Sequence, residues 1–262
     1  QLIPSGGSGT TDYLARWTSS SALGIGATRD DGTNVGIGVA PGTYKLNVNG
    51  DVNISGVYRT AGSRVVFLPD QTNFTGTVVY GNGGTALTHS AGLEGQYNLF
   101  VGLNTGASAT TASTNVLVGN QVGYNLTSGY QNTGMGHNTL FNCGSCYYNT
   151  ALGYNSMGNA TGAFFNAAVG ASSLLGLGNG YFNAAHGVNA LHEVSAGFGN
   201  SGFGTDAGYY TQANNGVFVG YKSGQNFVTG AKNISIGWRT MAVPWNVANS
   251  LNIGNGILGK NF

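Results

Sequence analysis

Hydrophobic and polar positions repeat every 17 residues through the C-terminal two thirds of the chain, with one step of 16 residues. A glycine marks each repeat and is taken as position 0: Gly102, Gly119, Gly136, Gly153, Gly170, Gly187, Gly204, Gly220, Gly237 and Gly254. Position −4 of eight repeats is asparagine: Asn98, Asn115, Asn132, Asn149, Asn166, Asn183, Asn200 and Asn233. A period held this long predicts a stack of equivalent units.

The residues just before each glycine alternate as in a β-strand. Positions −3 and −1 are mostly apolar, from Leu99 and Val101 in the first repeat to Leu251 and Ile253 in the last. Because side chains of a strand alternate between two faces, we expect these two positions to point inward. Position −2 is apolar or small, as at Phe100, which predicts a strand that is covered on both faces.

A second short segment is expected after each glycine, with a small residue at position +3 and a large apolar residue or glycine at position +4. Each repeat then forms two short strands and two corners, one coil of a parallel β-solenoid. The glycine would form a corner that is closed to residues with a Cβ. We expect the asparagine to adopt left-handed geometry at a corner and to hydrogen-bond along the stack. A ligand groove lined by asparagine is the alternative.

The predicted fold class is all-β, a parallel β-roll or β-solenoid of about ten 17-residue coils. A narrow coil with an apolar strand on both faces needs additional cover, and we expect a homotrimer around a common axis to provide it. Before the repeats, short strands are predicted near residues 13–17, 24–26, 36–38, 65–68 and 77–80. Turns are predicted at residues 30–32 and 81–84.

Composition narrows the choice of function. The chain has 47 glycines and 6% charged residues, where about 25% is usual, while its 41% hydrophobic content argues against disorder. A net charge of +1 provides no footprint for nucleic acid. No apolar run is long enough to span a membrane. The repeated positions lack acids, bases and nucleophiles, so we expect no enzyme and no cofactor, and a rigid extracellular protein.

Cys143 and Cys146 form the sharpest local motif. A redox pair at this spacing uses a helix N-terminus to lower the thiol pKa, and no helix is predicted here. A zinc site needs four ligands, and only His137 lies close in sequence. We expect a local disulfide that braces the corner, or two inert thiols. Metal binding at a trimer interface and redox catalysis are the alternatives.

Few other side chains could perform chemistry. His186 is expected to be a core histidine, because it occupies position −1 among apolar residues. His192 and Glu193, with Asp206, form the only acid-containing group of the repeats. A glycosidase needs two carboxylates about 5–9.5 Å apart, and the sequence leaves the separation of Glu193 and Asp206 open. A surface pair is the expected reading.

Two further sets of polar residues give little information about function. Asp30, Asp31 and Asp51 could hold a hard cation, but a turn with solvated charges is expected instead, because no calcium-loop spacing is present. Glycosylation sequons occur often by chance in a chain this rich in Asn, Ser and Thr. They lie at Asn53, Asn73, Asn125, Asn159 and Asn233.

Aromatic residues gather in pairs within the repeats. The pairs are Tyr147–Tyr148, Phe164–Phe165, Tyr181–Phe182 and Tyr209–Tyr210. Rings stacked one coil apart would form a stripe along the solenoid. Packing between subunits is the expected role of this stripe, and a platform for sugars is the alternative.

The repeats resemble those of trimeric autotransporter adhesin heads, and more closely the 17-residue version in phage tail fibres, as in the segment YNTALGYNSM at residues 148–157. The segments NVGIGVAP and KLNVNG, residues 34–41 and 45–50, are similar to a signature of trimeric fibre proteins that precedes a self-cleaving chaperone. The segment at residues 249–254 resembles the one that often precedes that chaperone. The resemblance implies a trimeric, left-handed β-roll. The family's chaperone, with its serine nucleophile, is absent from these residues, either removed after assembly or never present.

The predicted organisation has four parts: an N-terminal β region at residues 1–60, a connecting β segment at 61–95, the repeats at 96–254 and a tail at 255–262. The predicted function is that of a structural or adhesive fibre, of a phage tail or a cell surface, which gives rigid reach and receptor or glycan attachment. Two alternatives are a subunit that polymerises end to end into an extracellular filament, and a polysaccharide-degrading tailspike.

Overall fold

The computed structural model describes residues 13–19, 22–40, 46–48, 57–60, 63–67, 75–84, 86–88, 92–225, 230–240, 248–254 and 257–260. Within these residues all helix or strand structure is β-strand. The chain divides into two compact units, Gln1–Ser55 and Gly56–Phe262.

The first unit contains a four-stranded sheet in the order β1–β2–β3–β4. Its strands are β1 (Tyr13–Ser19), β2 (Ala22–Asp30), β3 (Val35–Ile37) and β4 (Leu46–Val48). The predicted turn lies between the antiparallel strands β2 and β3. There the Asp30 carboxylate accepts a hydrogen bond from the N–H of Gly32 at 2.8 Å, and Asp31 accepts one from the N–H of Asn34 at 2.7 Å. These bonds are the usual local partners of Asp in a turn.

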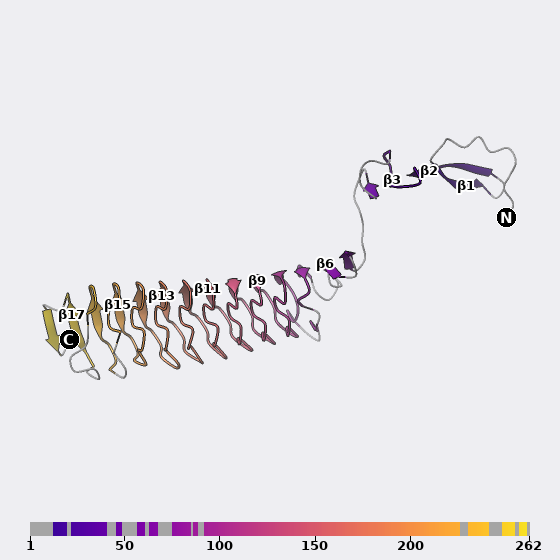
Figure 1. The fold of residues 1–262 in the computed structure, drawn as a ribbon. Helices are drawn as coiled ribbons and strands as arrows, with labels where there is room; N and C mark the ends of the chain where they lie inside the picture. Colours follow the sequence, from indigo (N-terminus) through magenta and orange to yellow (C-terminus); the bar gives the residue numbers. More distant parts are fainter. Residues whose placement is uncertain are drawn as a thin grey trace. The chain divides into compact units, whose positions relative to one another are not determined.

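The second unit is one 14-stranded sheet in which strands follow one another in chain order (Figure 1). Before the repeats lie β5 (Val57–Thr60), β6 (Ser63–Phe67) and β7 (Val78–Gly81). The repeats supply β8 (Leu99–Gly102), β9 (Val116–Asn120), β10 (Thr133–His137), β11 (Thr150–Leu152), β12 (Ala167–Val169), β13 (Ala184–His186), β14 (Ser201–Phe203), β15 (Val217–Val219), β16 (Ile234–Ile236) and β17 (Ser250–Ile253). The last strand is β18 (Ile257–Lys260).

The eleven strands from β7 to β17 pair in parallel, one per coil. Equivalent positions face one another, so that Gly136 pairs with Gly119. The predicted all-β parallel solenoid is therefore confirmed. The stack begins one coil before residue 96, because Gly81 pairs with Gly102 and has a φ of 119°. Antiparallel pairing ends the parallel stack on both sides, at β6–β7 and at β17–β18.

The prediction of which strand positions face inward was wrong. Position −2 forms the core: Phe100, Leu117 and Phe218 have no exposed surface. Positions −1 and −3 lie on the outer face, where Met135 is 52% and Val116 40% exposed. The coil is so narrow that its inner column holds many small residues, whereas the outer column holds larger apolar ones. In the single chain the strand is therefore covered on one face only.

The second predicted strand is also wrong, since the segment after each glycine is a series of turns. Two left-handed residues bend it, for example Asn138 at position +2 (φ 54°) and Leu140 at position +4 (φ 53°). The segment still bonds to its neighbours through backbone groups: the N–H of Gly123 donates to the carbonyl of Thr139 at 2.9 Å. Single β-bridges at position +11, such as Tyr130 with Tyr147, complete the coil.

Large and small residues compensate one another inside most coils. Where position −2 is large, position +4 is glycine, as in the pair Leu117 and Gly123. A Cβ on Gly123 would lie 2.8 Å from Cδ1 of Leu117, which real Cβ atoms do not tolerate. In the four coils from Gly136 to Gly187 the order is reversed, as at Ala151 and Met157, which are both buried. In the coil of Gly204 both positions are glycine, and side chains of the neighbouring coils, Leu191 and Phe218, fill the space. The core therefore keeps a nearly constant volume, as close packing requires.

The corner glycines are required by both conformation and space. Gly153 has a φ of 133°, a region that residues with a Cβ rarely adopt. A Cβ there would also lie 2.6 Å from the carbonyl oxygen of Gly170 in the next coil. The neighbouring coils thus approach one another through backbone atoms at this corner.

Candidate functional site

The asparagine ladder is buried inside the stack. Seven of its members, from Asn98 to Asn200, lie one above another, and from Asn115 onward each amide donates through Nδ2 to the Oδ1 of the one before, as Asn149 does to Asn132 at 3.0 Å. Asn149 also donates to the carbonyl of Ala163 at 2.8 Å. These buried and bonded amides do not line a ligand groove. The prediction that the asparagine itself has a left-handed backbone was wrong. The left-handed residue is the one before it, as at Tyr148 with a φ of 57°.

The ladder is interrupted at the 16-residue step. Gly216 takes the place of an asparagine there and donates its N–H to Oδ1 of Asn200 at 2.9 Å. Asn233 lies beyond the interruption and donates to the carbonyl of Gly230 at 2.7 Å, while its own Oδ1 accepts from the N–H of Ser250. Backbone groups thus satisfy the amides where the side-chain ladder stops.

Cys143 and Cys146 form a disulfide that is fully buried in the core. They occupy positions +7 and +10, which also lie close together in other coils, as at Leu126 and Gly129. Alanines fill both positions in the next coil, at Ala160 and Ala163. Burial separates this pair from solvent and from reactive partners, so it serves as core filling, unlike the exposed thiols of redox enzymes.

The expectation of a core histidine at His186 was wrong. Because position −1 faces outward, His186 is exposed, and its ring stacks on Phe203 of the next coil with the centroids 6.4 Å apart. His137 is also exposed and stacks on Tyr154 at 5.5 Å. Among the described residues there is no group of three or more His, Cys, Asp or Glu that could hold a metal ion.

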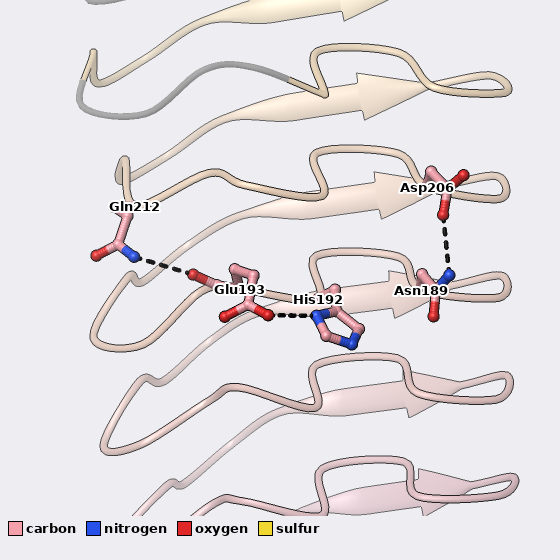
Figure 2. Close-up of polar contacts among 5 residues, drawn as sticks. All are labelled: Asn189, His192, Glu193, Asp206 and Gln212. Carbon is pink, nitrogen blue, oxygen red and sulfur yellow. Dashed lines mark hydrogen bonds and ion pairs between the residues drawn. The ribbon is translucent and has the colours of Figure 1, made fainter.

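The two carboxylates of the acid-containing group have different partners. Figure 2 shows Glu193 and Asp206 in adjacent coils at separate corners. Glu193 accepts from Nδ1 of His192 at 2.8 Å, whereas Asp206 accepts from Nδ2 of Asn189 at 3.0 Å and lies 3.9 Å from Nζ of Lys222. Each carboxylate therefore has its own local partners, and neither faces the other across a common space.

The remaining polar candidates are accounted for by local bonding. Asp30 and Asp31 hold the turn after β2, while Asp51 lies outside the described residues, as do the sequons at Asn53 and Asn73. A second, outer amide ladder contains the other two sequons of the early coils. In it Asn125 donates to Asn142 at 2.9 Å, and Asn142 donates to Asn159 at 3.2 Å. The sequon at Asn233 lies in the buried ladder.

The expected aromatic stripe is present at positions +11 and +12. The first row contains Tyr130, Tyr147, Phe164, Tyr181 and Phe198, with centroids 4.8–5.1 Å apart and nearly parallel rings. The second row contains Tyr148, Phe165 and Phe182. Rings inside a row stack on the rings before and after them, whereas Phe182, at the end of the second row, is stacked on Phe165 alone and is 58% exposed. Tyr209 and Tyr210 lie elsewhere, since Tyr209 stacks on His192 at 4.5 Å.

The phenol groups have perturbed acidities in both places. Burial, and then repulsion from Tyr148 and Tyr147, raises the pKa of Tyr130 above its usual value. Burial is also the main cause that raises the pKa of Tyr209, followed by repulsion from Tyr210 and Glu193. A raised pKa keeps both of these phenol groups neutral at physiological pH.

Positions −3 and −1 of β7 to β17 form one face of the sheet, which we call the outer sheet face. It is the largest feature that the sequence analysis placed incorrectly, since these positions were expected to point inward. Its most exposed apolar members are Tyr80, Val116, Met135, Phe203, Ile234, Ile236 and Ile253, each between 37% and 52% exposed. Parallel sheets are normally covered on both faces, so an apolar outer face of this length is unusual for a monomer.

Comparison of the chain with protein-family models, curated proteins and solved structures found no match. Within the described residues, no helix has the length and apolar character needed to cross a membrane.

Proposed function

We propose that this chain is a structural, non-enzymatic part of an extracellular trimeric fibre, from a phage tail or a cell surface, which provides rigid reach for attachment. The observation that carries the proposal is the outer sheet face. It runs along the stack from Tyr80 in β7 to Ile253 in β17, is mostly apolar, with Thr133, Thr150, His186 and Ser201 as its polar members, and contains no Asp, Glu, Lys or Arg. Three copies around a common axis would bury three such faces at once and would leave none exposed.

Self-association fits this face better than capture of a different partner. The repeats offer one unbroken surface along many coils, which a second copy in the same register matches along its whole length. Cyclic symmetry closes such an interface without leaving a free face for aggregation. The resemblance to trimeric fibre repeats supports the same arrangement.

Rigidity follows from the inner ladder and the backbone bonding of each coil. Buried amides that bond to one another hold the coils in register, because slippage would leave their polar groups without partners. Solenoid units that bond to both neighbours in this way suit a rod that carries an attachment site away from a surface.

A discrete rod is favoured over an end-to-end filament by the ends of the sheet. Continuation of the parallel stack into another molecule would require free parallel strands at both ends. Antiparallel strands occupy these places, β6 next to β7 and β18 next to β17. The tailspike alternative is disfavoured by the separate locations of Glu193 and Asp206 (Figure 2).

The test is the mass of the protein in solution, together with negative-stain images. We expect a trimer and discrete rods for the unmodified chain. Met135→Glu places a charge on the outer sheet face and should dissociate the trimer, while Ser128→Glu, at an exposed polar corner, should not. A monomer at micromolar concentration, or equal behaviour of both variants, would contradict the trimer. Indefinite filaments would favour the polymer instead.

A further inference from the structure

The outer sheet face contains one side chain whose ordinary chemistry changes its charge between pH 5 and pH 8, the imidazole of His186. It occupies position −1 of β13, the seventh of the eleven parallel strands, and is exposed in the single chain. The other positions of this face hold apolar side chains and hydroxyl groups. The cost of burying the face therefore depends on pH at this one place in the middle of the stack.

Uncharged side chains surround the His186 ring on its own face. The residues that pair with it at position −1 are Val169 on β12 and Phe203 on β14. Its ring stacks on Phe203 with the centroids 6.4 Å apart. Position −3 of the same strand is Ala184, whose methyl group is too small to cover an imidazole. Neither neighbouring strand thus brings a charged group beside this ring.

The two carboxylates of the repeats lie away from this face, in the turns that follow the strands (Figure 2). Asp206 lies at the corner after β14, where it is 3.9 Å from Nζ of Lys222. Glu193 accepts from Nδ1 of His192 at 2.8 Å. Each carboxylate has its own local partner, and neither occupies position −3 or −1. The described repeats therefore place no acid on the outer sheet face that could stabilise a protonated His186.

In the proposed trimer the three copies of His186 would lie close to one another. Cyclic symmetry places equivalent residues at the same height along the axis. The outer sheet face is only two side-chain columns wide, and positions −3 and −1 are about 7 Å apart along a strand. A ring in either column is thus near the axis. A neutral imidazole has one donor and one acceptor nitrogen, so three rings can each donate to the next.

We infer that His186 makes assembly of the trimer sensitive to pH, so that copies associate when the ring is neutral and separate in acid. The inference rests on the proposed fibre function, since it names what regulates the contact between copies. Protonation would turn both ring nitrogens into donors and would place three positive charges in an apolar interface. In the single chain the exposed ring takes up a proton in contact with water. Protons therefore bind separate chains more tightly than the trimer, and acid favours separation.

The test follows the molecular mass of the full chain by light scattering during urea titration at pH 7.5 and at pH 5.0. Only about 3% of an ordinary imidazole is neutral at pH 5.0, against about 90% at pH 7.5. Because assembly in acid must remove up to three protons per trimer, we expect the urea midpoint for loss of the trimer mass to be about 1 M or more lower at pH 5.0.

Two variants remove the titrating group, and a third is the matched control. His186→Phe places at this position the residue that the next coil has there, Phe203, and His186→Gln keeps a polar side chain that does not titrate. Each should reduce the pH shift of the midpoint at least threefold. His192→Phe is the control, because Phe141 has the same coil position and His192 lies outside the outer sheet face. It should keep the full shift.

Several outcomes would overturn the inference. They are a trimer whose midpoint is the same at both pH values, a shift that persists in both His186 variants, or a shift that His192→Phe removes. Dissociation of the trimer by EDTA at pH 7.5 would assign the rings to a metal ion and would also overturn it. Circular dichroism checks that each variant folds, and His186→Gln decides if His186→Phe does not. Monomers at pH 7.5 would contradict the proposed fibre function, while a trimer that is insensitive to pH would contradict this inference alone.

Discussion

The compensation between positions −2 and +4 can be tested with a double-mutant cycle at Leu117 and Gly123. Leu117→Ala removes a fully buried side chain and leaves a cavity, which typically costs 2–5 kcal/mol, here about 3 kcal/mol. Gly123→Leu alone forces a side chain against Cδ1 of Leu117, and overpacking costs about 1–3 kcal/mol. A left-handed leucine adds about 1 kcal/mol, although Leu140 already has this conformation in the next coil.

The double variant reproduces the arrangement of later coils, where Ala168 is paired with Leu174. The two single costs together amount to about 5–7 kcal/mol, whereas we expect the double variant to lose no more than about 2 kcal/mol. The coupling energy is then at least about 3 kcal/mol, at the upper end of the range for residues in contact.

Guanidinium unfolding followed by far-UV circular dichroism measures this cycle at one fixed protein concentration. Leu117→Ala combined with Leu174→Ala is the control, since these sites lie three coils apart, about 14 Å, and their costs should add. Costs that add within about 0.5 kcal/mol for Leu117 and Gly123 would refute the constant-volume core.

Three further predictions concern the ladder, the corner glycine and the disulfide. Asn149→Asp should destabilise the protein more at pH 7 than at pH 4, because the buried carboxylate faces the Asn132 and Ala163 oxygens and regains a donor only when protonated. Urea unfolding measures this, and an equal loss of unfolding free energy at both pH values would contradict it. Gly153→Ala should cost about 3 kcal/mol or more in the same assay. The control Gly144→Ala, whose new Cβ would have no neighbour closer than 3.9 Å, should cost under about 1 kcal/mol. Similar costs for both variants would argue against a requirement for glycine at the corner. Cys143→Ala with Cys146→Ala should cost about 2 kcal/mol or less, because the closed loop is short and alanines fill these positions in the next coil; loss of the cooperative transition would show that the cross-link is essential.

The architecture could be predicted from the sequence because the period itself encodes it. A 17-residue repeat with glycine at one column and asparagine at another requires identical geometry in each coil, and the structure has this geometry from Gly102 to Gly237. These columns are informative because few other residues can replace theirs. The glycine forms a corner that has no room for a Cβ, and the asparagine supplies a buried amide that both donates and accepts hydrogen bonds.

The facing of the strand could not be predicted from apolar character alone. Position −1 holds Val101, Met135 and Phe203 and is more hydrophobic than position −2, which holds Gly134 and Ala151 in the same stretch. The signal that identifies the core is covariation in size, with Leu117 opposite Gly123 and Ala151 opposite Met157. Such covariation arises only where two side chains share one enclosed volume.

The left-handed corner was missed for a different reason. Position +12 is occupied by residues that rarely adopt positive φ, among them Gln131, Tyr148 and Phe165. Bonding to the coils above and below fixes the backbone there and overrides local preference, so no glycine signature marks the site.

The parallel sheet ends in antiparallel strands on both sides. The number of coils between these two ends therefore sets the length of the parallel stack. Each coil contains its own corner glycine. In most coils the large and small core residues that compensate one another also belong to the same coil. Insertion or deletion of one whole 17-residue unit, such as residues 137–153, would therefore change the rod by one strand spacing, about 4.8 Å, without altering its ends. In a fibre of the proposed kind, the number of repeats would set the reach of the rod in fixed steps of about 4.8 Å.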